Sequence, residues 1–174
     1  QRSYDNIIHD VAIQNLPVIL CLDRGGLVGE DGATHHGTFD IAYLRSIPNV
    51  IVSAPSNEAD LRDLMFTAMP SGSPFSIRYP RGSGTGADWK SEPSSLEIGK
   101  GRIEREGTDI AVISIGTTAA DAARAAENAA SKGISVEHIN LIFVKPLDEK
   151  LLHRTGRKFE KVITVEDRVT AGGA

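Results

Sequence analysis

The sequence predicts an α/β fold made of two parallel-sheet domains. Short apolar runs, partly β-branched, alternate with segments of helical periodicity, which is typical of parallel strands joined by helices. Residues 83–99 are rich in Gly, Pro and Ser and separate two such alternations. With 174 residues, 40% hydrophobic and 24% charged, the composition indicates a globular chain and disfavours disorder and coiled coil.

The first predicted domain, residues 1–82, begins with a helix over residues 4–15, whose apolar residues recur on one face until Pro17. Three apolar runs then predict strands buried on both faces. Ser56 is expected to cap a helix that stops before Pro70. The three strands are expected at residues 18–22, 50–54 and 75–77.

The second predicted domain, residues 100–174, repeats this rhythm after the 83–99 linker. An Ala-rich helix over residues 119–132 is closed by Gly133. Asp148 is expected to cap a further helix that contains Leu151 and Leu152. Strands are expected at residues 110–115, 134–141 and 162–165.

Charge and apolar patterning exclude several classes of partner. The formal charge is −4, which gives no electrostatic footprint for nucleic acid or an acidic membrane surface. The apolar runs are far shorter than the ~20 residues of a membrane span. The single cysteine, Cys21, is predicted to be a buried thiol and fits a reducing compartment. The chain starts at Gln1 in a helical pattern and stops at residues 172–174 just after a strand, so both ends are expected to be cut.

The densest polar segment, residues 23–37, follows the first predicted strand. Ligand sites in parallel α/β sheets lie beyond the carboxyl ends of strands, which is where this loop falls. Five glycines allow sharp turns, Arg24 can hold an anion, and His35 or His36 can donate a proton near neutral pH. The alternatives are a long connection without function, or a metal site at the two histidines that lacks a third ligand at a recognisable spacing.

Two further polar segments lie at strand ends. Arg78 and Arg81 follow the strand at 75–77 and are interpreted either as anion ligands or as arginines in solvent. Residues 166–168 follow the last strand and are either on the ligand side or a packed ion pair at a domain contact. All six cations of residues 1–85 are arginines, which favours recognition of phosphate or carboxylate.

Four motifs follow one another along the chain: GEDGATH at 29–35, RYPRG at 78–82, FVKPLD at 143–148 and TVED at 164–167. Together they resemble the 1-deoxy-D-xylulose 5-phosphate synthase family of the transketolase superfamily. The loop motif alone is shared with transketolase, whereas His36-Gly37 and the second motif point to the synthase family. Ala33 stands where the family often has proline. The resemblance implies two parallel-sheet domains of transketolase type, with residues 1–82 as the later part of the pyrimidine-binding domain and residues 100–174 as most of the C-terminal domain.

The resemblance implies condensation of pyruvate with glyceraldehyde 3-phosphate and loss of carbon dioxide. By family correspondence, His35 is the catalytic residue that hydrogen-bonds the reacting oxygens. Asp31 is implied as a polar substrate contact beside it. Arg24, Arg81 and Arg2 are implied to hold the triose phosphate or the acidic donor.

The resemblance also implies a cofactor that this chain does not hold. Family enzymes use thiamine diphosphate and Mg²⁺, and the motifs that bind them would precede Gln1, so no cofactor or metal ligand is expected within the chain. The fragment alone is expected to be inactive. A homodimer is implied, and a bacterial cytoplasmic location is expected, with a plastid peptide upstream of Gln1 as the alternative.

Two other classes of function stay open at this point. Transketolases and the β-type subunits of 2-oxoacid dehydrogenases share the architecture expected for these two domains. A non-catalytic α/β assembly module, dimerising through the Ala-rich helix or the Glu166 region, is the alternative outside enzymes.

Overall fold

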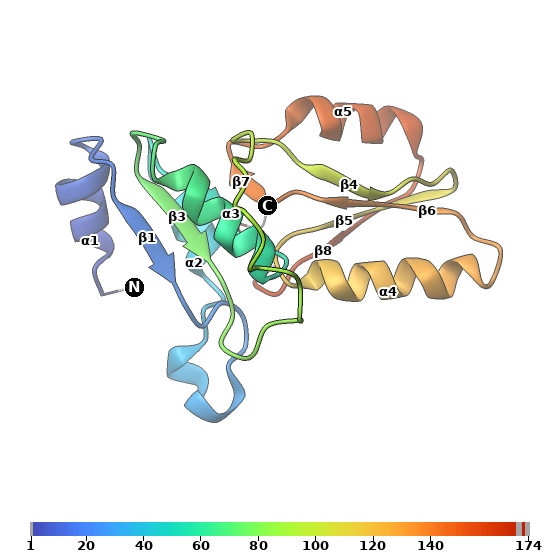
Figure 1. Cartoon of the computed structure of the whole chain (residues 1–174), viewed down its shortest axis with the longest axis horizontal. Helices are drawn as coiled ribbons and strands as arrows, with labels where there is room; N and C mark the ends of the chain where they lie inside the picture. The colour runs from blue at the N-terminus through green and yellow to red at the C-terminus, as the bar shows by residue number, and fades with distance from the viewer. Residues whose placement is uncertain (1, 170–171, 173–174) are drawn as a thin grey trace.

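A computed structural model describes residues 2–169 and 172; Gln1, Gly173 and Ala174, at the ends expected to be cut, lie outside them. Two four-stranded sheets lie side by side and carry helices on their faces (Figure 1). The α/β prediction is therefore confirmed. The first sheet has the order β1-β3-β2-β7 and the second has the order β4-β6-β5-β8.

The first sheet is parallel except at one edge. β1, β3 and β2 run parallel, so their carboxyl ends meet at one side of the sheet. β7 pairs antiparallel with β2 although it comes from the second half of the sequence, an edge pairing that the sequence did not predict. The strands are β1 (Ile19–Leu22), β2 (Ile51–Ser53), β3 (Phe75–Arg78) and β7 (Phe143–Lys145).

The helices of the first half differ in detail from their predictions. The N-terminal helix is present but shorter, as α1 (Tyr4–Asn6) followed by a π-helix, η1 (Ile7–Ala12). A short helix, α2 (Asp40–Arg45), follows the glycine-rich loop, and α3 (Glu58–Ala68) follows β2.

The predicted cap of α3 was displaced by one residue. Asn57 is the cap, because its side chain accepts a hydrogen bond of 2.9 Å from the Asp60 amide. The Ser56 hydroxyl instead donates to the Asp60 carboxylate. Both residue types suit a cap, and only the local backbone decides between them.

The second sheet lies between α4 and α5, which cover its opposite faces (Figure 1). Asp148 caps α5 as predicted, accepting from the Leu151 amide at 3.1 Å. β4 was not predicted, since its Arg-Ile-Glu-Arg sequence has little apolar character, and it pairs antiparallel with β6. The elements are β4 (Arg102–Arg105), β5 (Ile110–Ser114), α4 (Thr118–Ala130), β6 (Val136–Asn140), α5 (Glu149–Lys158) and β8 (Val162–Val165).

One apolar core joins the two halves. Leu44 and Val52 of the first half pack in the same cluster as Ile113 and Ile139 of the second, and all four are buried. The outer strand β1 is less buried than predicted, because it has a neighbouring strand on one side only, and the outer strand β8 is likewise largely exposed. Cys21 on β1 is accordingly exposed, so its predicted burial was wrong.

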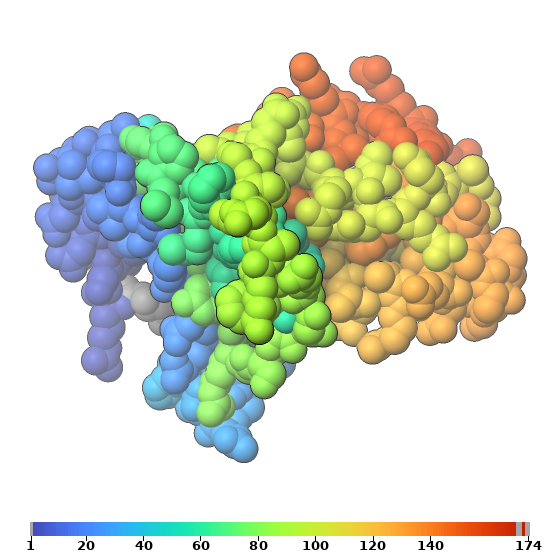
Figure 2. All heavy atoms as spheres, viewed as in Figure 1, coloured from blue at the N-terminus to red at the C-terminus, as the bar shows by residue number. Residues whose placement is uncertain are grey.

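The segment at 83–99 has no helix or strand and lies across the front of the molecule between the two halves (Figure 2). Its start is held by Glu58, whose carboxylate accepts from the Thr85 amide at 2.9 Å and the Gly86 amide at 2.6 Å. Backbone N–H groups, first its own and then that of Thr85, lower the pKa of Glu58 to about 2.

Glu58→Gln is expected to loosen the start of this segment. The depressed pKa means that the hydrogen bonds to the charged carboxylate are fully present above pH 4.5 and are lost as the pH falls towards 2. At pH 7 the variant should therefore lower the hydrogen-exchange protection of the Thr85 and Gly86 amides, and wild type should lose that protection on acidification. Equal protection of these amides in wild type and variant at pH 7 would contradict the proposal that the Glu58 carboxylate fixes the start of the segment.

Candidate active site

The glycine-rich loop and the segment after β3 emerge together from the carboxyl ends of β1 and β3 (Figure 1). The Tyr79 amide donates to the Leu22 carbonyl at 2.9 Å, and the Gly25 amide donates back to the Tyr79 carbonyl at 2.9 Å. These bonds continue the β1–β3 ladder beyond the strands. The two polar segments singled out from the sequence therefore form one site.

Hydrogen bonds close the 23–37 loop at its base. The Gly37 amide donates to the carbonyls of Arg24 and Gly26, each at 3.0 Å, and the Gly26 amide returns a bond of 3.1 Å to the Gly37 carbonyl. A Cβ at Gly37 would lie 2.3 Å from the Arg24 carbonyl oxygen, so only glycine fits where the two ends of the loop meet. The loop is thus a closed structure that holds its side chains in fixed places.

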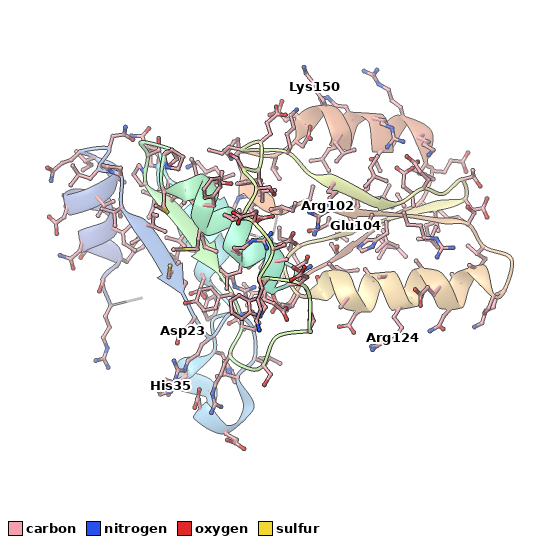
Figure 3. The ribbon with its side chains drawn as sticks, viewed as in Figure 1. Asp23, His35, Arg102, Glu104, Arg124 and Lys150 are labelled. Carbon is pink, nitrogen blue, oxygen red and sulfur yellow. The ribbon has the colours of Figure 1, made fainter. Side chains whose placement is uncertain are left out.

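A pocket of about 280 Å³ opens on this loop. It brings together three residues that the sequence singled out, Arg2, Arg24 and His35, and Figure 3 shows Asp23 and His35 in this part of the molecule. Its walls are almost entirely polar, which suits a small anionic or hydroxylated ligand. The lining residues are Arg2, Asp23, Arg24, Thr34, His35, His36, Gly37 and Asp40.

Asp31 and Arg81, the other two predicted residues, join the site through Arg24. The Asp31 carboxylate accepts from Arg24 Nε at 2.9 Å and lies 3.4 Å from Arg81 Nε. The hydrogen bond from Arg24, followed by the charge of Arg81, lowers the pKa of Asp31, and the same bond raises the pKa of Arg24. Asp31 thus holds two guanidinium groups side by side, and both remain partly exposed to a ligand.

The adjacent histidines have different surroundings. His36 Nδ1 accepts a hydrogen bond of 3.2 Å from the Val28 amide, so the ring proton of His36 lies on Nε2. This bond stabilises the loop. His35 is exposed, and its Nδ1 lies 3.1 Å from the Thr34 hydroxyl. Of the two, His35 is therefore the one free to act on a ligand. Within residues 2–169 and 172 no group of three or more potential ligands could hold a metal ion.

Arg78 is a site residue that the sequence left undecided. Its side chain is 4% exposed, so the interpretation as an arginine in solvent was wrong. It donates to the Gly37 carbonyl at 2.8 Å and to Asp167 Oδ1 at 2.7 Å. The interpretation of residues 166–168 as a packed ion pair at a contact between the two halves is therefore confirmed.

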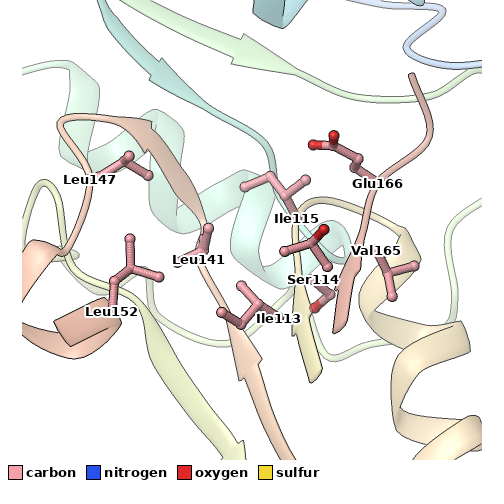
Figure 4. Close-up of a pocket in the computed structure, with 9 residues that line it drawn as sticks. Ile113, Ser114, Ile115, Leu141, Leu147, Leu152, Val165 and Glu166 are labelled. Atoms are coloured by element: carbon pink, nitrogen blue, oxygen red, sulfur yellow. The ribbon is translucent and has the colours of Figure 1, made fainter. Parts of the chain in front are cut away.

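A second pocket, of about 160 Å³, lies between β5, β8 and α5 (Figure 4). Most of its wall is aliphatic, including Leu147 and Leu152, with Glu166 at one side. It presents no cationic side chain, so it does not match an anionic substrate.

The polar pocket does not fit thiamine diphosphate. A heteroaromatic ring needs an apolar or aromatic wall, and a metal-bound diphosphate needs a cluster of metal ligands. The pocket lining offers neither. The residues described here fit a small anion instead.

Comparison with known families accounts for both halves of the chain. Residues 1–85 match the transketolase pyrimidine binding domain, and residues 99–174 match the transketolase C-terminal domain. The chain belongs to the transketolase superfamily. The gap between the two transketolase matches falls on the segment that has no regular structure.

Curated relatives of this transketolase-type chain carry the name 1-deoxy-D-xylulose-5-phosphate synthase. The protein from Bacteroides fragilis is 58% identical over 99% of the chain, that from Phocaeicola vulgatus 57%, and that from Syntrophus aciditrophicus 51%. The chain spans 27–28% of the length of these relatives.

Among solved structures, a split-gene transketolase described as an inactive β4 tetramer matches with a TM-score of 0.88. The match has 27% identity and covers 99% of this chain and 55% of that one. The fold and domain pairing of this chain are therefore those of transketolases. No helix in the described part of the chain is long and apolar enough to cross a membrane.

Proposed function

We propose that the full-length protein condenses pyruvate with glyceraldehyde 3-phosphate, with loss of carbon dioxide, to give 1-deoxy-D-xylulose 5-phosphate. The observation that carries the proposal is the pair of guanidinium groups, Arg24 and Arg81, held by Asp31 beside a pocket that contains His35. The names of the relatives support this reaction over that of a transketolase or a 2-oxoacid dehydrogenase.

The arginines bind the phosphate of the acceptor in this proposal. A guanidinium presents parallel N–H donors that match phosphate oxygens, and two of them on one carboxylate form a clamp of such donors. Asp31 keeps the clamp assembled, and its lowered pKa, caused first by the hydrogen bond from Arg24, keeps the carboxylate ionised to more acidic pH than usual. In this proposal Arg2, which also lines the pocket, binds the carboxylate of the donor.

His35 acts on the reacting oxygens. Its exposed ring lines the pocket and can donate a hydrogen bond, or a proton, to an oxygen that becomes an alkoxide. His36 and Arg78 keep the loop that carries His35 in place. Thiamine diphosphate, the electron sink of the proposed reaction, and Mg²⁺ would be bound by residues outside this chain.

The 174-residue chain is accordingly expected to show no thiamine diphosphate binding. Calorimetric titration with thiamine diphosphate and Mg²⁺ should give no heat of binding, because the described pocket has neither a ring-stacking wall nor metal ligands. Cooperative thermal unfolding of the same sample serves as the control for folding. Tight Mg²⁺-dependent binding of thiamine diphosphate would contradict the proposal that residues outside this chain bind the cofactor.

We also propose that the full-length protein is a cytoplasmic homodimer. Leu27 on the site loop is 78% exposed and Phe39 beside it is 49% exposed, and apolar groups of this size next to an active site favour a subunit contact. The bacterial origin of the relatives and the presence of only one cysteine in the 174 residues support the location. Light scattering of the purified full-length protein tests the dimer, and a monomeric mass would overturn it.

A further inference from the structure

Arg78 connects the site loop to a segment far away in the sequence. It lies at the end of β3, and its two terminal nitrogens serve different partners: Nη2 donates to the Gly37 carbonyl and Nη1 donates to Asp167 Oδ1. Gly37 closes the loop that carries His35, whereas Asp167 follows β8. A single buried side chain thus joins the loop base to the second half of the chain.

The site loop packs closely against the Arg78–Asp167 ion pair. A Cβ on Gly25 would lie 2.9 Å from the Arg78 guanidinium, and a Cβ on Gly26 would lie 2.3 Å from Asp167 Oδ2. Both glycines belong to the site loop, so the loop backbone packs directly on the ion pair. The Val169 amide adds a bond of 3.4 Å to the Thr38 carbonyl. The loop base therefore has little freedom to move while the pair is intact.

Two carboxylates, those of Asp40 and Asp167, lie beside the Arg78 guanidinium and fix its position. Asp40, which also lines the pocket, lies 3.9 Å from Arg78 Nε. Asp40 also accepts from the Tyr43 hydroxyl at 2.8 Å. Arg78 is thus shared by two carboxylates, and loss of Asp167 would free its guanidinium to turn towards Asp40 and away from the Gly37 carbonyl.

We infer that Asp167 is a positioning residue, which acts through Arg78 to hold the loop that carries Arg24 and His35. The inference rests on the proposed function for the identity of the ligand, a phosphorylated aldehyde. It assigns to the second half of the chain a part in acceptor affinity, although the lining residues in the described part of the chain all come from the first half.

The test uses Asp167→Ala and Asp167→Asn in the full-length protein. Asparagine keeps an acceptor for Arg78 but not the charge, whereas alanine removes both. We expect Asp167→Ala to raise the KM for glyceraldehyde 3-phosphate about 3- to 30-fold and also to lower kcat, because the same loop carries His35; both effects should be smaller for Asp167→Asn. Asp121→Ala is the matched control, because Asp121 forms an exposed pair with Arg124 on α4, remote from the site.

Hydrogen exchange gives a second readout that does not depend on turnover. In Asp167→Ala the amides of residues 24–37 should exchange faster while those of β5 and β6 stay protected. A lowered melting temperature with unchanged KM and unchanged loop exchange would overturn the inference, since Asp167 would then only stabilise the fold. If wild type forms no product, the proposed function fails, and loop exchange alone decides whether Asp167 positions the loop.

Discussion

His35→Ala in the full-length protein is expected to lower kcat/KM by about 10²- to 10⁴-fold, the usual contribution of a general acid or base. The His35 ring is exposed and lines the polar pocket, so its removal takes away the donor to the reacting oxygen without leaving a cavity in the core. The melting temperature should stay close to that of wild type. Steady-state kinetics with pyruvate and glyceraldehyde 3-phosphate measure the effect.

His153→Ala is the matched control for this prediction. His153 is exposed on α5, on a face of the second sheet away from the site loop. The His153→Ala variant should retain wild-type kinetics. Activity of His35→Ala within about threefold of wild type would remove His35 from the catalytic role.

Arg81→Ala is expected to impair use of the phosphorylated acceptor selectively. Hydrogen bonds to charged groups contribute about 1.5–3 kcal/mol, so the KM for glyceraldehyde 3-phosphate should rise roughly 10- to 100-fold. The KM for pyruvate and the rate of carbon dioxide release should change much less. Arg81 lies 3.4 Å from Asp31 and is half-exposed, so the fold does not depend on it.

An acceptor without a phosphate group tests directly whether Arg81 binds the phosphate. With glyceraldehyde as the acceptor, wild type and Arg81→Ala should react at similar rates, because the group that Arg81 binds is absent. Arg124→Ala, on the solvent side of α4, is the control for loss of an exposed arginine (Figure 3). An equal loss of pyruvate and triose phosphate use in Arg81→Ala would contradict the assigned role.

The sequence predicted those elements whose residues show a strong local pattern. β5, the Ala-rich α4 and the Asp148-capped α5 follow from apolar runs, helical periodicity and capping chemistry within a few residues. β4 and β7 were not predicted, because each owes its place to pairing with a distant strand rather than to its own composition. The joining of both halves in one core likewise depends on contacts that no local pattern reveals.

The candidate site shows the same limit. Arg24 and His35 were found because a glycine-rich polar loop after a buried strand indicates a ligand site by position alone. Arg78 was left between two interpretations, because its burial depends on Asp167, which lies 89 residues away. Family resemblance named Asp31 and Arg81, but their shared contact with each other became visible only in three dimensions.

Product analysis of the full-length gene product tests the central claim most directly. Supplied with pyruvate, glyceraldehyde 3-phosphate, thiamine diphosphate and Mg²⁺, it is expected to release one carbon dioxide for each 1-deoxy-D-xylulose 5-phosphate formed, and to be inactive with ketose phosphate donors. Two-carbon transfer from a ketose phosphate, with no product from pyruvate, would contradict the account and make the protein a transketolase.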